Sequence, residues 1–268
     1  MNQKNFEYLK EQVKFSGFGE GLESELKMNL EKQMPSFELK HQAAYGKDEV
    51  SATLHFRRSE QNDMYFFNKY DIELKQLGAG NALCQTFYLA KDHTITLKEA
   101  YNLMSGRSIN KDLNNKDGML YNAWLQLDFK QTDDKGNFKI KQFHQNYGFD
   151  LTKELDKHLI KELGTEQDKT RLIESLNRGN RQMVTFMYES GEQKRFIEAS
   201  PQFKSINIYD SNLRRVGLRE VAGEKEGQSD SIQKEAKKAN QKQSDLDDEQ
   251  ETIKESNKRI RSKGHSIH

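Results

Sequence analysis

The sequence contains very little cysteine, proline and tryptophan for its length. Among its 268 residues there are 1 Cys, 2 Pro and 1 Trp. The single cysteine, Cys84, cannot form an intramolecular disulfide, and chains without disulfides are typical of reducing compartments. A lone cysteine also excludes a Cys-x-x-Cys metal or redox site. These absences favour a cytoplasmic location.

Long hydrophobic runs are absent as well. No apolar stretch approaches the length of about 20 residues that a membrane helix requires, and no apolar signal core follows the first five residues. The net charge is only +1, although charged residues make up 32% of the chain. Nucleic-acid binders usually carry an excess of positive charge. The sequence therefore predicts no membrane association, and a nucleic-acid contact would have to come from a local basic patch.

Aromatic residues are missing from one end of the chain. The sequence has 15 Phe, 10 Tyr and 1 Trp, and the last of them is Tyr209. From Gly217 onwards there are 11 basic residues, 11 acidic residues and no aromatic residue. Such a segment cannot bury enough apolar surface to offset its chain entropy. We therefore predict a folded part that ends near residue 215 and a disordered charged tail over 216–268.

The folded part is predicted to begin with two helices and an antiparallel meander, over residues 1–95. Apolar residues spaced three or four positions apart, around Leu9 and Leu26, predict the helices. The period then changes to two, which is typical of half-buried strands. The predicted strands cover residues 37–41, 52–56, 64–77 and 83–89.

The second region, 96–215, contains a motif that occurs twice. One helix begins at Thr96, with Glu99 as its capping-box partner, and ends in Leu-x-x-Gly at Gly106. The helix over 167–178 ends in the same pattern at Gly179. Each precedes a strand–turn–strand segment, the first after a loop rich in Asn, Asp and Lys.

We interpret this pattern as two loosely repeated helix–hairpin units, with chance similarity as the alternative. The strand–turn–strand segments cover 121–143 and 182–199, and 205–209 is one further candidate strand. Helices and hairpins that alternate irregularly predict an α+β fold with antiparallel sheets. The second region is either a separate domain or continuous with residues 1–95.

The residue types that catalysis needs do not form a motif. The histidines are scattered singly, and no G-x-S-x-G pattern exists. Carboxylates such as Asp71 and Asp128 lie on predicted strands, where a charged residue usually marks the solvent face. We predict no metal and no cofactor. The sequence favours a non-enzymatic accessory or interaction protein; the alternative is an enzyme of unrecognised type with a carboxylate-lined site on the sheet.

Two aromatic stretches are candidate contact surfaces. In residues 64–70 apolar side chains run consecutively and include Tyr65 and Phe67. In residues 138–147, Lys139 and Lys141 alternate with apolar side chains. Proteins that bind single-stranded nucleic acid combine stacking aromatics with basic residues in this way. Core packing of the aromatics is the alternative interpretation.

The predicted tail ends in a basic cluster. An acidic segment at 245–249 precedes it. Either this end is a solvated tail, or it is a basic arm that contacts nucleic acid or an acidic partner. The candidate contact residues are Lys258, Arg259, Arg261 and Lys263.

Five segments of the folded part resemble a bacterial protein family. They are Met-Tyr-Phe-Phe-Asn at 64–68, Leu-Lys-Glu-Ala-Tyr-Asn-Leu at 97–103, and the segments 121–129, 146–151 and 199–210. Members of this uncharacterised family, a domain of unknown function, are encoded on conjugative and integrative mobile elements of gut bacteria. The family has no assigned active site, so the resemblance implies no catalytic residue. It implies a mobile-element accessory protein whose partner is nucleic acid or a DNA-processing enzyme.

Overall fold

The helices and strands were located in a computed structural model that describes residues 2–89 and 94–217. The α-helices in these ranges are α1 (Gln3–Val13), α2 (Glu23–Glu31), α3 (Leu97–Met104), α4 (Leu151–Leu155) and α5 (Glu166–Asn177). The strands are β1 (Ser36–Tyr45), β2 (Asp48–Arg58), β3 (Tyr65–Lys75), β4 (Leu83–Tyr88), β5 (Ile109–Asn114), β6 (Leu120–Thr132), β7 (Phe138–His144), β8 (Gln182–Tyr188), β9 (Gly191–Ser200) and β10 (Ser205–Tyr209).

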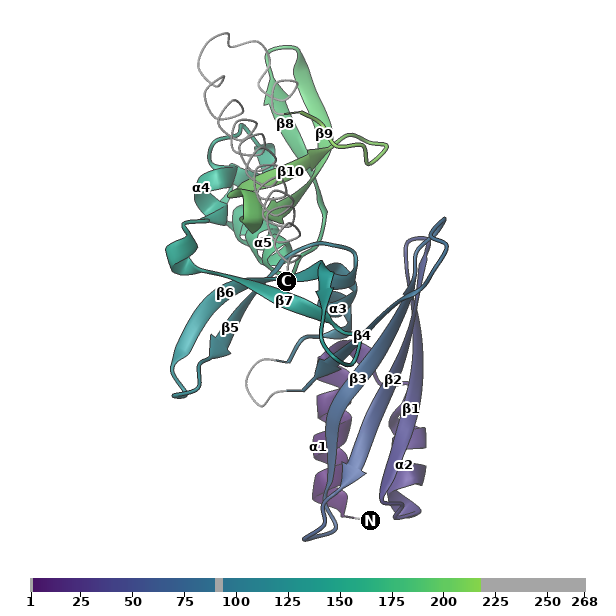
Figure 1. Ribbon diagram of the computed structural model, residues 1–268. Coiled ribbons are helices and arrows are strands. Elements are labelled where there is room, and N and C mark those ends of the chain that lie inside the picture. The colour runs from purple at the N-terminus through teal and green to yellow at the C-terminus, as the bar shows by residue number, and fades with distance from the viewer. Residues whose placement is uncertain (1, 90–93, 218–268) are drawn as a thin grey trace, which may run out of the picture. The chain divides into compact units, whose positions relative to one another are not determined.

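The strands form three antiparallel sheets (Figure 1), which confirms the predicted α+β fold. Their orders are β1-β2-β3-β4, β5-β6-β7 and β10-β9-β8. None of the described helices is long and apolar enough to cross a membrane. The predicted disordered tail, with Lys258, Arg259, Arg261 and Lys263, lies outside the described residues except for its first two positions, where Val216 is buried and its N–H donates to the Ile208 carbonyl at 2.8 Å.

The first sheet is covered on one face by α1 and α2 (Figure 1). The Asn2 side chain begins α1 by accepting a hydrogen bond from the Asn5 N–H at 3.2 Å. The apolar stripe around Leu9 then faces the alternating inner residues of the strands, such as Leu54 and Ile72, and all three are buried. Burying a side chain of this size stabilises the fold by roughly 1.5–3 kcal/mol. The helices predicted from the three-to-four-residue spacing and the strands predicted from the alternation therefore pack into one core.

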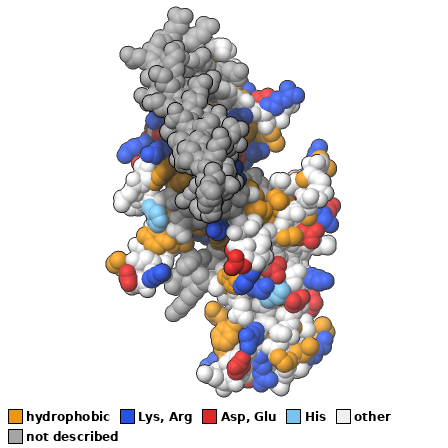
Figure 2. Space-filling view, in the orientation of Figure 1, with side chains coloured by type: hydrophobic (Ala, Val, Ile, Leu, Met, Phe, Trp, Pro, Cys, Tyr) orange, Lys and Arg blue, Asp and Glu red, His pale blue; other side chains and the backbone are white. Residues whose placement is uncertain are grey.

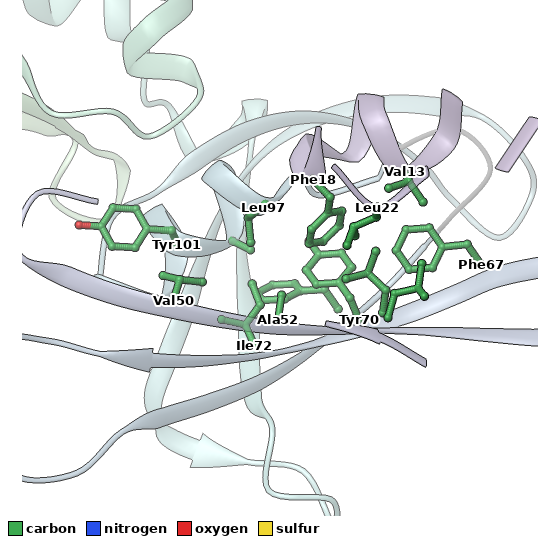
Figure 3. Close-up of a cluster of buried hydrophobic side chains, with 14 of the residues drawn as sticks. Val13, Phe18, Leu22, Val50, Ala52, Phe67, Tyr70, Ile72, Leu97 and Tyr101 are labelled. Atoms are coloured by element: carbon green, nitrogen blue, oxygen red, sulfur yellow. The ribbon is translucent and has the colours of Figure 1, made fainter. Parts of the chain in front are cut away.

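This core continues across the boundary expected at residue 95. Buried residues of α3, including Leu97 and Leu103, belong to the same cluster as Phe18 of the N-terminal helical layer (Figure 3). The predicted capping box begins α3: the Thr96 hydroxyl accepts from the Glu99 N–H, and the Glu99 carboxylate accepts from the Thr96 N–H at 2.9 Å. Residues 2–89 and 94–217 belong to one compact unit.

Each predicted helix–hairpin unit is a helix followed by a three-stranded meander. Helix α3 precedes β5, β6 and β7, and α5 precedes β8, β9 and β10. The sequence predicts a loop at the position of strand β5. The reason is that this segment contains the polar residues Asn110, Lys111 and Asp112. Only Ile109 and Leu113 of this strand are buried. Two apolar residues are too few to reveal a strand in an otherwise polar segment.

The two helices end in the same backbone motif. Gly106 and Gly179 both have positive φ angles, +81° and +77°. In each helix the glycine N–H donates to the carbonyl three residues earlier, at 2.9 Å. The next N–H donates to the carbonyl five residues earlier, at 3.0 Å after α3 and 3.1 Å after α5. This is a Schellman cap, which glycine accommodates without steric cost.

The two caps also contact each other directly. The Asn102 amide donates to the Arg178 carbonyl at 2.7 Å and to the Asn180 side chain at 3.0 Å. The Arg107 guanidinium donates to the Gly179 carbonyl at 2.9 Å and to the Asn102 side chain at 2.7 Å. Asn102 and Arg107 are buried. A buried, fully bonded polar junction of this kind specifies one arrangement of the groups that it joins.

Candidate nucleic-acid interface

Tyr65 and Phe67 are core residues, which corrects their prediction as contact residues. Each side chain is 3% exposed. Phe67 stacks on Phe56 with ring centroids 4.9 Å apart and points into the core (Figure 3). The Tyr65 hydroxyl donates to the Met34 carbonyl at 2.6 Å. The ring that this strand leaves in solvent is Phe66, which is 48% exposed. The alternative interpretation, core packing, therefore holds for both predicted residues.

Lys139 and Lys141 lie on β7, an edge strand of the second sheet. Most residues of β7 are exposed. Successive side chains of a strand point to opposite faces, so the two lysines share one face with Phe143. The pairing register agrees, because these three residues lie opposite alternate residues of β6, namely Asp128, Gln126 and Trp124. The Trp124 ring packs against Phe149, with centroids 5.4 Å apart. The predicted lysine face thus exists and continues into an aromatic residue.

One carboxylate lies among these lysines. The Lys141 ammonium is 2.9 Å from Asp128, whose side chain is only 8% exposed. Asp128 lies opposite Lys139 in the register and also accepts the Lys130 backbone N–H at 3.1 Å. Contact with the Lys141 ammonium holds the pKa of the Asp128 carboxyl below its usual value. Lys141 pairs with this carboxylate, Lys139 lies opposite it in the register and Lys130 follows it on β6, so lysines outnumber carboxylates on this part of the two strands.

Aromatic side chains from two other segments extend the lysine face. The Tyr147 ring, in the 3₁₀ turn η2 (Gln145–Tyr147), lies 5.0 Å from the Phe143 ring. The Tyr147 hydroxyl donates at 2.8 Å to the carbonyl of Gln202, in the 3₁₀ turn η4 (Pro201–Phe203). The Lys204 ammonium lies over the Tyr147 ring, 4.8 Å from its centroid. Phe203, which lies between Gln202 and Lys204 in the sequence, is 66% exposed.

We call this set the β7 surface. Its two lysines on β7 were predicted from the alternating pattern. Phe143 and Tyr147 belong to the predicted stretch 138–147, although they were not singled out in it. Phe203 and Lys204 were missed, because only the fold brings residues 201–204 beside residues 143–147. The one local signal is the segment 199–210, in which a Pro-Gln-Phe-Lys turn separates two strands. The members of the β7 surface are Lys139, Lys141, Phe143, Tyr147, Phe203 and Lys204.

Neutralising Asp128 should strengthen anion binding by the β7 surface. In the Asp128→Asn variant the amide oxygen can still accept the Lys130 N–H, while the Lys141 ammonium loses its carboxylate partner. We expect about threefold tighter binding of a single-stranded oligonucleotide, because the carboxylate no longer repels phosphate, and a salt slope that still reports about three lysine–phosphate contacts. Anisotropy titrations over a salt series measure both. Weaker binding by the variant would show that Asp128 supports the ligand instead of competing with it.

On the first sheet, two carboxylates contact one histidine side chain, that of His55. His55 Nε2 is 2.6 Å from Asp71, and His55 Nδ1 is 3.1 Å from Glu38. The Thr86 hydroxyl donates to Asp71 at 2.6 Å. Asp71 thus lies between the hydroxyl and the imidazole, which is not the order of a nucleophile–base–acid triad. Positive and negative side chains are interspersed over this part of the surface (Figure 2).

The most enclosed carboxylate of the third sheet is satisfied internally. Glu198 accepts hydrogen bonds from Arg181 at 3.2 Å, from Asn207 at 3.1 Å and from the Tyr209 hydroxyl. Burial and the contact with Glu198 raise the pKa of Tyr209 to about 12. These partners come from β10 and from Arg181, the residue that precedes β8. The arrangement stabilises the sheet, as expected of a buried and fully bonded polar cluster.

Two hollows in the described part of the chain are small. The two best-formed hollows, one lined by Asn5 and Arg58 and the other by Lys10 and Leu26, each have room for about one water molecule. Ligand pockets for small molecules are typically several hundred Å³. Residues 2–89 and 94–217 contain no group of three side chains placed to hold a metal ion. The β7 surface is therefore the arrangement that we take further.

No protein-family model, curated protein or solved structure matches the chain. The mobile-element context thus rests on the resemblance of the five sequence segments alone.

Proposed function

We propose that this chain is a non-enzymatic accessory protein that binds nucleic acid through the β7 surface. The observation that carries the proposal is the continuity of this surface. Lys139 and Lys141 stand on one face of an exposed edge strand. The same face continues through Phe143 and Tyr147 to Lys204. Basic side chains interleaved with aromatic rings are the combination that recognises a nucleic-acid chain.

The chemistry of these groups fits phosphate and base. A lysine ammonium is a compact point charge that binds phosphate without demanding one geometry. An aromatic ring offers a face on which any base can stack. The resemblance to a mobile-element family supplies the biological setting, because such elements are copied and transferred as DNA. A DNA-processing enzyme is the other partner that this setting allows.

The test is an anisotropy titration of the full chain against a fluorescein-labelled oligonucleotide of about 15 nucleotides. Salt is varied from about 50 to 200 mM. Three lysine–phosphate contacts predict that log K falls with log salt with a slope of about −2, at about 0.7 per contact for single strands. Binding that ignores salt would contradict the proposal. An absence of binding would contradict the proposal and point to a protein partner. A pull-down with the same chain as bait and candidate DNA-processing enzymes as prey would then identify that partner.

The basic end of the chain needs its own control. In a full-length variant, the four residues Lys258, Arg259, Arg261 and Lys263 are each replaced by Gln. Binding that survives these changes comes from the folded unit, as we propose. Binding that disappears with them would assign the interaction to a non-specific basic arm.

A further inference from the structure

The aromatic rings of the β7 surface come from three separate segments. Phe143 belongs to β7, Tyr147 to η2, and Phe203 to η4, about 60 residues further along the chain. The Tyr147 hydroxyl bond to Gln202 joins η2 to η4. The fold therefore brings the turn that carries Phe203 beside the rings of Phe143 and Tyr147.

Tyr147 is held in position before any ligand arrives. Its hydroxyl is fixed by the Gln202 carbonyl at 2.8 Å, one side of its ring contacts Phe143, and the Lys204 ammonium lies over the ring. These contacts fix the turn that carries Phe203, so less conformational freedom is lost when a ligand binds there. Lys204 itself has φ +50°, in the left-handed region that a lysine rarely adopts.

Phe203 is the most exposed ring of the set. Its side chain is 66% exposed, while Pro201, two residues earlier, is buried at the start of the turn. Exposed phenylalanines occur singly on many surfaces without a role. This one is flanked by the residue that bonds Tyr147 and by the lysine that lies over the Tyr147 ring. Its position, rather than its exposure alone, marks it as a stacking residue.

We infer that the β7 surface recognises unpaired bases, so that its ligand is single-stranded nucleic acid. The inference rests on the proposed function and adds the class of ligand. The lysines of β7 contact phosphates, and a base stacks on Phe203, whose turn is joined to Tyr147. A duplex offers the same phosphates, but its bases are stacked within the helix. The rings of the β7 surface therefore discriminate single strands from duplexes.

The experiment separates bases from phosphates. The full chain is titrated with four labelled probes of equal length: oligo-dT, oligo-U, an abasic deoxyribose-phosphate oligomer and a DNA duplex. Each stacked base contributes about fivefold or more in affinity. We expect oligo-dT to bind at least about fivefold more tightly than the abasic oligomer and the duplex. The oligo-U arm shows whether RNA is accepted as well as DNA.

Variants of Phe203 locate the stacking contact. Phe203→Leu keeps an apolar side chain but removes the ring, and should lower oligo-dT affinity by about fivefold without changing abasic binding. Phe203→Trp should restore the affinity. The matched control is Phe15→Leu, at a phenylalanine that is 73% exposed on the N-terminal helical layer. It should bind like the unchanged chain.

The outcomes distinguish this inference from the proposed function. If no probe binds, the proposed function itself is wrong. If oligo-dT and the abasic oligomer bind equally, the chain binds phosphates only and the inference is overturned while the proposed function stands. An equal loss in Phe203→Leu and Phe15→Leu would also overturn it. Trp124, the single tryptophan of the chain, is buried in β6 and its emission verifies that each variant folds.

Discussion

A Lys139→Gln/Lys141→Gln double variant should bind single-stranded oligonucleotides about tenfold more weakly at moderate salt than the unchanged chain. Each lysine–phosphate contact releases condensed counterions, and its loss removes about half a decade of affinity and about 0.7 from the salt slope. Both side chains stand on the exposed face of an edge strand, so their replacement leaves no buried group unpaired apart from Asp128. Anisotropy titrations over a salt series measure the affinity and the slope together.

The control for this variant must change the net charge equally. Lys27 lies on α2 and Lys32 is the C-cap residue of that helix, and both residues are exposed. A Lys27→Gln/Lys32→Gln variant should bind like the unchanged chain, because long-range attraction by exposed charges is screened beyond about 10 Å at 0.1 M salt. Equal losses in the two double variants would mean that overall charge, not the β7 surface, sets the affinity. A normal Trp124 emission in both variants shows that the second sheet is intact.

The sequence predicts the elements of this fold better than it predicts their contacts. The stripe around Leu9, the alternation in β1 to β3 and the capping box at Thr96 are local patterns, and each survives in the structure. Strand β5 was missed because pairing with β6, not its own composition, makes Ile109–Asn114 a strand. Local patterns predict periodic elements, whereas a polar strand depends on its neighbours.

The candidate site shows the same division between local and distant information. Alternation alone places Lys139 and Lys141 on one face, and the register confirms that they share it. The consecutive apolar run at residues 64–70 misled the prediction, because hydrophobicity does not tell a stacking ring from a core ring. Tyr65 and Phe67 face the core, and only Phe66 between them is exposed. The contribution of Phe203 required the fold, since nothing local relates residue 203 to residue 147.

Replacing Gly179 with alanine should destabilise the folded unit by about 3 kcal/mol. At φ +77° an alanine is strained by about 1–2 kcal/mol. Its Cβ would also lie 2.8 Å from the Ser108 carbonyl oxygen and 2.8 Å from Ile109. Relieving such contacts in a close-packed junction costs about 1–3 kcal/mol, since a backbone oxygen cannot move aside cheaply. For a chain of this size we expect Tm to fall by about 10 °C, measured by thermal unfolding followed by circular dichroism.

Gly106→Ala is the matched control, because the chain repeats the same cap. Its φ is +81°, and the nearest atom to an added Cβ is Phe129 Cε2 at 3.9 Å, an ordinary contact. This variant should lose folding stability only through the backbone strain of a left-handed alanine, about 1–2 kcal/mol. Similar losses in the two variants would mean that the contact between the caps adds nothing to stability. A larger loss at Gly179 would show that the close approach of the caps fixes the second helix–meander unit against the first. Lys139 and Phe203, which the proposed site needs together, belong to different units, so the site depends on that junction.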